Sequence, residues 1–380
     1  MIHYARIISC YTADTSGVCS ALYELGGMVV VHDASGCNST YATHDEPRWY
    51  TMDSMIYISG LTEIDAVMGN DEKFISDVCA SAKKLKPKFI AICGSPMPAM
   101  TGTDFDALAD IIGQRSGIKT FAMHTNGMKS YLVGASQAFE MLARNFCDKT
   151  GRAKSKPVVN ILGATPLDLS RQEIVDSVRK WLSENGFENG CCMAMGSTLE
   201  DFAQAGDADC NLVVSSSGLE AARVLRERFG TPFVTGLPFG KEYGKILADD
   251  IKRAVQNGED ILSCVEREHG AECDIAVVGE SIYAGSAARA VSMQTGRAAR
   301  VIHTLDTDSS LVAKCDKKLA DEDKLEAEFA NYKLILADPL FKPIIAEHTK
   351  LFALPHEAFS GRCFRKNIPD LVNKKIELEF

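Results

Sequence analysis

Short apolar runs alternate with longer segments of helical periodicity along most of the chain. The apolar runs predict strands at Met28–Val31, Phe89–Cys93, Lys119–Met123, Val158–Leu162, Asn211–Ser215, Ile275–Val278 and Leu334–Ala337. Between them, apolar positions three to four residues apart predict helices at Glu72–Leu85, Tyr131–Asn145, Ser170–Asn185, Ser217–Phe229, Lys241–Asn257 and Ile282–Thr295. Strands that alternate with helices in this way predict β-α units and parallel sheets.

Two local features refine this pattern near the ends of elements. Ser170 is predicted to cap the helix that begins at Arg171, with Glu173 three positions further on as in a capping box. Gly186 follows the predicted end of the same helix, where a left-handed residue commonly stops one. A strand is also expected at Ala5–Ser9, close to the start of the chain.

Two polar stretches predict domain boundaries. Lys149–Lys156 is basic and precedes a new strand, and Gly258–Cys273 is less regular because Ile261–Glu268 could be helical. A new strand begins after Cys273, so we place the second boundary there. The chain is therefore predicted to form three Rossmann-like α/β lobes, doubly wound around mainly parallel sheets, with a central cleft between them. The predicted lobes are residues 1–150, 151–272 and 273–380.

Composition narrows the class of partner. The 380 residues are 46% hydrophobic and 24% charged, which is ordinary for a globular protein. We find no run of about 20 apolar residues and no signal-peptide pattern. A net charge of −10 argues against nucleic acid and anionic membranes as partners, and is compatible with a basic protein partner.

The chain has 13 cysteines, an odd number without any Cys-x-x-Cys pair. A disulfide framework is therefore not expected, and so many thiols suit a reducing cytoplasm. Cys210, Cys264 and Cys315 show no partner pattern and are expected to act as small buried side chains.

One cysteine stands in a different context. The strand Met28–Val31 leads into His32, a small-residue turn and then Cys37. A thiol on a glycine-containing turn at the end of a strand is a poor choice for packing and a good one for holding a metal cluster.

The segment Val31–Cys37 resembles the His-Gly-x-x-Gly-Cys turn of the nitrogenase component 1 superfamily, with the same five-residue step from His to Cys. Further blocks resemble that superfamily in the same order along the chain: Leu61–Asn70, Lys86–Ile90, Thr101–Asp104, Asn160–Pro166, Ser216–Ala222, Arg228–Pro232 and Gly279–Tyr283. The superfamily includes dinitrogenase subunits, cofactor-assembly scaffolds, protochlorophyllide and chlorophyllide reductases, and short nickel-sirohydrochlorin a,c-diamide reductive cyclases.

The resemblance implies an iron–sulfur cluster, of the [4Fe–4S] type, bound by the first lobe. Cys37 matches one ligand position of the family. The two other positions lack cysteine here, so the nearby Cys10 and Cys93 are candidates, each expected to end a strand and face outward. Cys19, on the following helix, is a weaker candidate that could instead pack inside. His32 either lies near the cluster or is an ordinary turn histidine, with Asp33 able to orient it.

A second site is implied between the lobes. In nitrogen-fixing members a Cys of the second domain and a His of the third hold the large cofactor. Here no Cys stands around Val214–Ser216, whereas His356 fills the other position. A dinitrogenase-type cofactor is therefore not expected. His356 could be an axial ligand, a proton donor or a structural residue.

Three consecutive serines lie at the predicted start of a helix near this cleft. Ser215, Ser216 and Ser217 could bind a carboxylate or another anion, or simply cap the helix.

Neither a P-loop nor a dinucleotide fingerprint occurs in the sequence, so this chain is expected to bind neither ATP nor NAD. The resemblance implies a separate ATP-dependent iron-protein reductase, with contacts expected at Asp33, Asp45 and Glu46. It also implies a homodimer or a paired homologous subunit.

The predicted function is an iron–sulfur oxidoreductase that reduces a tetrapyrrole or small molecule. The alternatives are a non-catalytic scaffold for cofactor assembly and a cluster-free protein that binds a metal chelate or small ligand.

Overall fold

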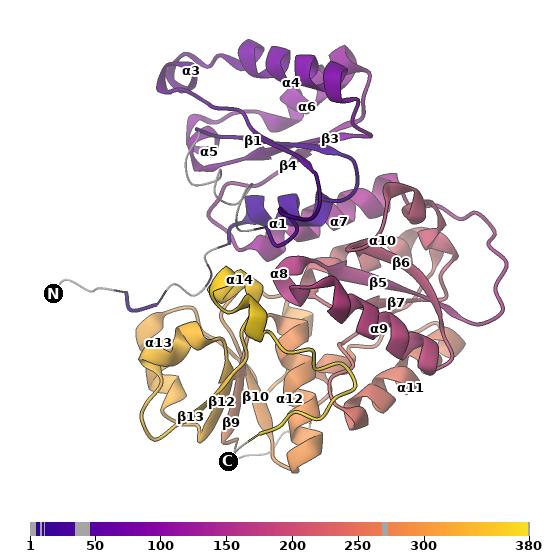
Figure 1. Cartoon of the computed structure of the whole chain (residues 1–380), viewed down its shortest axis with the longest axis vertical. Coiled ribbons are helices and arrows are strands. Elements are labelled where there is room, and N and C mark those ends of the chain that lie inside the picture. Colours follow the sequence, from indigo (N-terminus) through magenta and orange to yellow (C-terminus); the bar gives the residue numbers. More distant parts are fainter. Residues whose placement is uncertain (1–4, 8–9, 11, 35–45, 268–272, 379–380) are drawn as a thin grey trace.

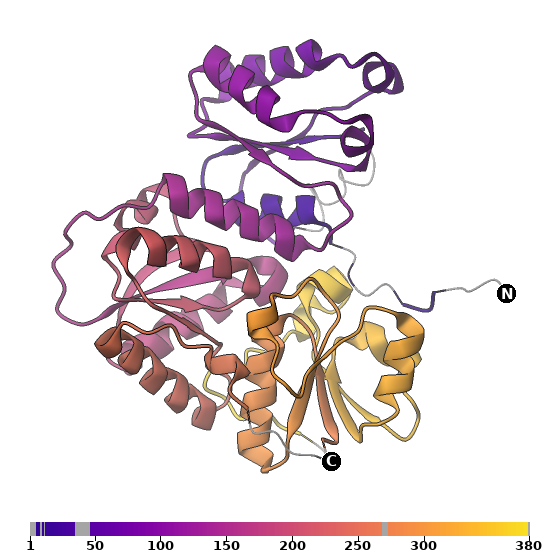
Figure 2. The same ribbon diagram turned by 180° about the vertical axis from the view of Figure 1, so that it is seen from behind.

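The computed structural model describes residues 5–7, 10, 12–34, 46–267 and 273–378. Within these residues the strands form three sheets, each parallel throughout and each flanked by helices. The predicted α/β fold of three lobes is confirmed. Figure 1 shows the first lobe above the other two, which lie side by side, and the view from behind in Figure 2 agrees.

The first sheet has the order β2-β1-β3-β4. Its strands are β1 (Met28–His32), β2 (Met55–Ile58), β3 (Ile90–Gly94) and β4 (Thr120–Met123). Its helices are α1 (Asp14–Leu22), α3 (Glu63–Met68), α4 (Asp71–Leu85), α5 (Pro96–Thr101), α6 (Phe105–Ser116) and α7 (Tyr131–Asn145). Side chains alternate between faces along a strand. Val30 therefore packs with α4 and α6, while Val31 packs with α1 and α7.

The second sheet has the order β6-β5-β7-β8 and the third β11-β10-β9-β12-β13. The second lobe contains β5 (Val158–Ala164), α8 (Pro166–Leu169), α9 (Gln172–Glu184), β6 (Glu188–Ala194), β7 (Cys210–Val213), α10 (Leu219–Phe229), β8 (Phe233–Thr235) and α11 (Lys241–Asn257). The third contains β9 (Ile275–Val278), α12 (Ser281–Thr295), β10 (Ala299–His303), β11 (Lys317–Lys318), α13 (Glu322–Phe329), β12 (Leu334–Ala337), β13 (Lys350–Ala353) and α14 (Glu357–Ser360).

The first two lobes share one core through the helix pair α1 and α7. The two helices touch at glycines: a Cβ atom on Gly17 would lie 1.9 Å from the carbonyl oxygen of Tyr131, and one on Gly134 would lie 1.8 Å from that of Asp14. The opposite side of α7 packs on α10 of the second lobe. The second and third lobes are also joined near the C-terminus, where Val372 pairs with Phe239 of the second lobe. The domain limits proposed from the sequence stay a prediction.

Two local predictions are wrong. Ser170 ends α8 with a φ of +59° instead of capping α9, because its hydroxyl donates to Glu357 at 3.2 Å. Ala5–Ile7, the described part of a predicted strand, forms none, since Arg6 is held by two glutamates of α13. In the segment that could be helical, the described residues contain only a short 3-10 turn at Ser263–Val265. The prediction for Gly186 is confirmed, with a φ of +90° just beyond α9.

No helix in the described parts of the chain is long and apolar enough to cross a lipid bilayer.

Candidate functional site

Four helices from the three lobes begin at one buried junction, and each brings a polar side chain to it. The helices are α7, α8, α12 and α14, and α8 packs directly against α14 (Figure 1). Their polar groups are Tyr131, Asp168, Glu280 and His356, all at most 4% exposed. Helices that follow parallel strands start at the carboxyl edge of the sheet, which is where α/β folds bind their ligands.

Asp168 lies at the centre of this junction. Its Oδ1 accepts a hydrogen bond from the Tyr131 hydroxyl and lies 3.4 Å from Nε2 of His356. Burial, reinforced by the negative charge of Asp168, raises the pKa of Tyr131 well above its usual value, so the phenol keeps its proton. The second oxygen, Oδ2, is buried without a hydrogen-bond partner among the described residues. Because an unpaired buried carboxylate oxygen is costly, this atom marks a place for a polar ligand or water.

The backbone fixes the tautomer of His356. Its Nδ1 accepts a hydrogen bond from the backbone N–H of Ala358 at 3.3 Å, and its own backbone N–H donates to Asp338 at 2.8 Å. An imidazole whose Nδ1 accepts must carry its proton on Nε2, which here faces Asp168. Which of the three predicted roles His356 takes stays a prediction. An axial ligand bound through Nε2 would first have to separate His356 from Asp168.

The serine cluster already faces an anion that belongs to the protein. The backbone N–H of Ser216 donates to Glu280 at 2.9 Å, while Ser215 accepts from the backbone N–H of Ser217 at 3.3 Å. Glu280 also accepts from the first backbone N–H groups of α12. Burial and the nearby Asp168 raise the pKa of Glu280. Ser215 therefore caps the turn, as one of the two predicted roles had it, and Ser216 binds a carboxylate of the third lobe. Binding of an external anion by these serines stays a prediction.

Two cavities between the lobes open beside this junction. One of about 490 Å³ lies between the first and third lobes and is lined by Cys10, Lys129, His303 and Lys318, among others. The other, of about 430 Å³, reaches Ser216 and Thr307. Asp306 lines both cavities and accepts from Ser130 at 2.7 Å. The cleft expected from the sequence is thus present as two adjoining cavities.

The predicted cluster ligands do not come together in the described residues. Cys37 lies outside them. No group of three or more His, Cys, Asp and Glu side chains suited to a metal occurs within the described ranges. Cys10 lines the larger cavity, where its Sγ lies 3.4 Å from the carbonyl oxygen of Ala358, and burial raises its pKa to about 11. The described residues alone therefore do not fit an iron–sulfur cluster.

Cys93 and Cys19 are core residues. The expectation that Cys93 turns outward is wrong, because β3 continues through Gly94. The carbonyl oxygen of Gly94 accepts a hydrogen bond from the Thr125 hydroxyl at 2.8 Å. Cys93 is fully buried on the face of the sheet that packs against α1, which carries Cys19. Burial raises the pKa of both thiols, to about 12 for Cys19. Neither side chain is placed as an accessible thiolate.

His32 is oriented by a serine and not by Asp33. Its Nδ1 lies 2.9 Å from the hydroxyl of Ser59, and its ring packs on Phe74 with centroids 4.2 Å apart. Asp33 instead accepts from the hydroxyl of Ser95 at 2.7 Å. Burial lowers the pKa of His32. The imidazole is therefore neutral and held away from the side of the sheet that carries Cys93.

Replacing His32 by Gln is expected to flatten the acid side of the stability profile. A lowered folded pKa means that the unfolded chain binds the proton first as pH falls through about 6.5. The native state therefore loses stability from that pH down to the folded pKa, and a glutamine removes this loss. Urea unfolding between pH 5 and 8 measures the difference. His124→Gln, at an exposed site, is the control; parallel profiles for H32Q and wild type would contradict the prediction.

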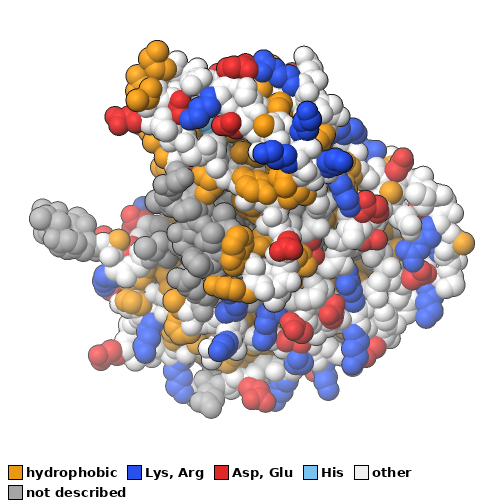
Figure 3. Space-filling model, turned by 45° about the horizontal axis from the view of Figure 1, so that its top comes forward, with side chains coloured by type: hydrophobic (Ala, Val, Ile, Leu, Met, Phe, Trp, Pro, Cys, Tyr) orange, Lys and Arg blue, Asp and Glu red, His pale blue; other side chains and the backbone are white. Residues whose placement is uncertain are grey.

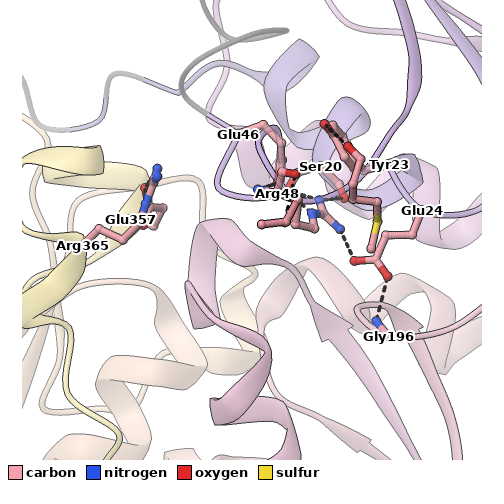
Figure 4. Close-up of polar contacts among 10 residues, drawn as sticks. Ser20, Tyr23, Glu24, Glu46, Arg48, Gly196, Glu357 and Arg365 are labelled. Carbon is pink, nitrogen blue, oxygen red and sulfur yellow. Dashed lines mark hydrogen bonds and ion pairs between the residues drawn. The ribbon is translucent and has the colours of Figure 1, made fainter.

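A buried ion triad lies where the described chain resumes at Glu46 (Figure 4). The Arg48 guanidinium binds Glu46 at 2.7 Å and Glu24 at 2.8 Å, and the other oxygen of Glu24 accepts from the backbone N–H of Gly196 in the second lobe. The side chain of Glu46 is 1% exposed. The expected role of Glu46 in docking a reductase is therefore wrong, and Asp45 lies outside the described residues.

Apolar side chains gather on the surface near the same end of the first sheet. Ile64, Val67 and Met68 of α3 are at least 75% exposed, and Met97 and Met100 of the adjacent α5 are also exposed. We call these five residues the α3–α5 patch; Figure 3 shows apolar side chains on this face of the first lobe. The two helices follow β2 and β3, whose carboxyl ends lie beside that of β1, which leads toward Cys37. Exposed apolar patches of this kind are typical of protein or membrane contacts and of ligand grooves.

Comparisons with known proteins place the chain among oxidoreductases. A family model described as nitrogenase component 1 type oxidoreductase matches residues 15–288. One subunit of the light-independent protochlorophyllide reductase of Prosthecochloris aestuarii is 26% identical over 158 residues, covering 40% of this chain and 29% of the relative. The corresponding subunit from Prochlorococcus marinus is 28% identical over 177 residues, covering 43% of this chain and 34% of the relative.

These matches cover only about a third of the length of the curated relatives. A solved structure of nitrogenase Cp1 at pH 6.5 matches over a larger extent, with a TM-score of 0.66 across 98% of this chain and 92% of that chain. At 15% sequence identity, this likeness shows the fold alone.

Proposed function

Because the chain belongs to the nitrogenase component 1 type oxidoreductase family, we propose that it is an iron–sulfur oxidoreductase whose substrate binds in the cleft between its three lobes. The observation that carries this proposal is the buried group of Tyr131, Asp168 and His356 beside two adjoining cavities. Reduction of an organic bond requires protons as well as electrons. Tyr131 holds a proton on its phenol oxygen and donates it to Oδ1 of Asp168, and His356 carries its proton at Nε2, which lies 3.4 Å from the same oxygen.

Electrons are proposed to arrive from an ATP-dependent iron-protein reductase. A [4Fe–4S] cluster held by Cys37 would supply one-electron transfer at low potential. Because the described residues alone do not fit a cluster, the remaining ligands are proposed to come from a second copy of the chain or from a homologous subunit. The α3–α5 patch lies at the sheet edge that leads to Cys37, so we propose that a partner docks there.

The substrate is proposed to be a tetrapyrrole or a small molecule with a bond that is hard to reduce. The name of the relatives, protochlorophyllide reductase, supports the first class. The two cavities together offer space for a ligand larger than a few atoms, and Lys129 and Lys318 line the larger one. Cationic side chains there favour a ligand that carries carboxylates. We place this reaction in the cytoplasm, where thiols stay reduced.

Reduction of the bound iron is expected to need both the reductase and hydrolysable ATP. Protein purified without oxygen is mixed with an iron-protein reductase and ATP, and iron reduction is followed by absorption and EPR spectra. A non-hydrolysable ATP analogue and NADH without a second protein are the controls, and both are expected to leave the iron oxidised. Rapid reduction by NADH alone would contradict the electron route.

The same preparation separates the alternative functions. Protein that stays colourless and iron-free after reconstitution with iron and sulfide would support the cluster-free binding protein. Iron that is bound but lost to a second protein, without turnover, would support the assembly scaffold.

A further inference from the structure

A pocket opens on the outer face of the first sheet, away from the cleft between the lobes. It lies between the edge strand β2 and helix α4, and Figure 1 shows α4 on the side of the sheet opposite to the other two lobes. Its volume is about 180 Å³. None of the residues of β2 is buried, because α4 packs toward α6 and leaves this edge of the sheet open.

Alternate residues of β1 and one face of α4 make the walls of this pocket apolar. Met28 and Val30 lie on the same face of the sheet as Tyr57, which is the register partner of Val30 in β2. Phe74 and Val78 lie one turn apart on α4 and face the strands. An apolar cavity of roughly 150 Å³ can hold a benzene molecule, so this pocket accommodates a compound of one or two fused rings.

His32 brings a buried nitrogen to the pocket. Its side chain is 6% exposed, and its ring packs on Phe74. The Ser59 hydroxyl donates to the carbonyl oxygen of Asp33 at 3.3 Å, so the Ser59 oxygen accepts from Nδ1 of His32 at 2.9 Å. Burial outweighs the nearby carboxylates and lowers the pKa of His32. The ring therefore stays neutral, with its proton on Nδ1 and a lone pair on Nε2.

The lone pair on Nε2 of His32 is not used by the protein. Within the described residues this nitrogen makes no hydrogen bond, and it is not one of the polar atoms there that are closed off from solvent. Because His32 lines the pocket, Nε2 is reached from it. An acceptor among apolar side chains is costly to leave without a partner, and a ligand with an N–H or O–H group would remove that cost.

The charges at the rim of the pocket work against an anionic ligand. Lys73, the cation that lines the pocket, is bound to Asp65 at 2.6 Å, and Asp65 also accepts from Thr62 and Asn70. Asp77 lines the rim as well, and it makes neither an ion pair nor a hydrogen bond in the described chain. A negatively charged ligand would therefore meet an unpaired carboxylate as well as the acceptor nitrogen.

We propose that this pocket binds a small ring compound without negative charge, whose N–H or O–H group donates a hydrogen bond to Nε2 of His32. The ring lies against Val30, Phe74 and Val78, which supply apolar contact, and the imidazole selects for the donor. The pocket is separate from the cleft between the lobes and shares no lining residue with its two cavities. The proposal therefore does not rest on the proposed function.

Indole and benzofuran are matched probes for this pocket, because their rings have the same size and only indole carries an N–H donor. Isothermal titration calorimetry is carried out with the full chain purified without oxygen. Indole is expected to bind, and benzofuran to bind about fivefold more weakly, the effect of one hydrogen bond. His32→Leu is expected to weaken indole to the level of benzofuran. Ser81→Phe is expected to abolish binding of both probes, because Ser81 lines the pocket and the larger side chain fills it.

Ser76→Phe is the matched control for the blocking variant. Ser76 is exposed on the same helix, outside the pocket, where its hydroxyl donates to Glu72 at 3.1 Å. This variant is expected to bind indole as the wild type does. Three results would each overturn the proposal: no binding of millimolar indole by the wild type, equal affinity for the two probes, or unchanged indole binding in Ser81→Phe. The titration needs neither reductase nor ATP, so failure of the proposed electron route would leave its result standing.

Discussion

Cys37→Ser is expected to remove most of the iron from protein purified without oxygen. A serine hydroxyl replaces a thiolate poorly, because thiolates are the ligands that iron–sulfur clusters require. The residue follows the end of β1 by five positions, in a segment whose sequence resembles the cysteine turn of the family. Iron and sulfide per chain, measured after reconstitution and gel filtration, give the retained fraction directly.

The controls come from cysteines with a clear position in the fold. Cys210→Ser and Cys264→Ser are expected to keep the iron, because both side chains are fully buried in or beside the second lobe. Cys10→Ser is expected to lose part of the bound iron, since Cys10 lines the cleft. Equal iron in Cys37→Ser and wild type would show that the turn binds no cluster.

Cys93→Ser separates a ligand from a packing residue. Because its thiol is buried against α1, a buried hydroxyl there is expected to cost about 1–3 kcal/mol of stability. Thermal unfolding of the iron-free protein would detect this cost. A loss of iron without a loss of stability would instead favour Cys93 as a ligand.

The alternation of apolar runs and helical periods is sufficient to predict the three parallel sheets. Some strands escape prediction where the pattern weakens, although β2 (Met55–Ile58) and β10 (Ala299–His303) are also missed despite apolar sequences. The strand β6 begins with Glu188 and Asn189, and β8 contains only Phe233–Thr235. The predicted cap at Ser170 fails because its hydroxyl binds Glu357, a partner far away in sequence that no local pattern contains.

The junction can be predicted only in part for the same reason. The family resemblance identifies His356, whereas Tyr131 and Asp168 escape notice because they look like ordinary first-turn residues. Their chemistry depends on contacts between lobes, such as the hydrogen bond from Tyr131 to Asp168. Asp168 and Glu280 do share one local signal, since each lies at the start of a helix that directly follows a strand. The exposure expected for Glu46 and Cys93 is wrong because burial is a property of the assembled fold.

Arg48→Met is expected to destabilise the chain by about 3–5 kcal/mol, since removing one member of a buried ion group leaves the others uncompensated. Arg48 also donates to the backbone oxygen of Ser20 at 2.8 Å and covers the ring of Tyr23 at 4.6 Å. Without it, Glu24 and Glu46 would lose the guanidinium that both carboxylates bind. The midpoint and slope of urea unfolding give the change in free energy.

An exposed pair provides the matched control for this prediction. Arg115 binds Glu72 on the surface, and Arg115→Met is expected to cost no more than about 1 kcal/mol. Adding Glu46→Gln to Arg48→Met is expected to recover part of the loss, because one buried charge is then removed. If Arg48→Met were as stable as Arg115→Met, the triad would contribute nothing to the fold. The variant also tests the first lobe's function, because Arg48 binds Glu46, nine residues after Cys37, and the backbone of Ser20 in α1. If Arg48→Met loses both stability and iron, and the double variant with Glu46→Gln recovers both, the triad positions the segment that carries Cys37.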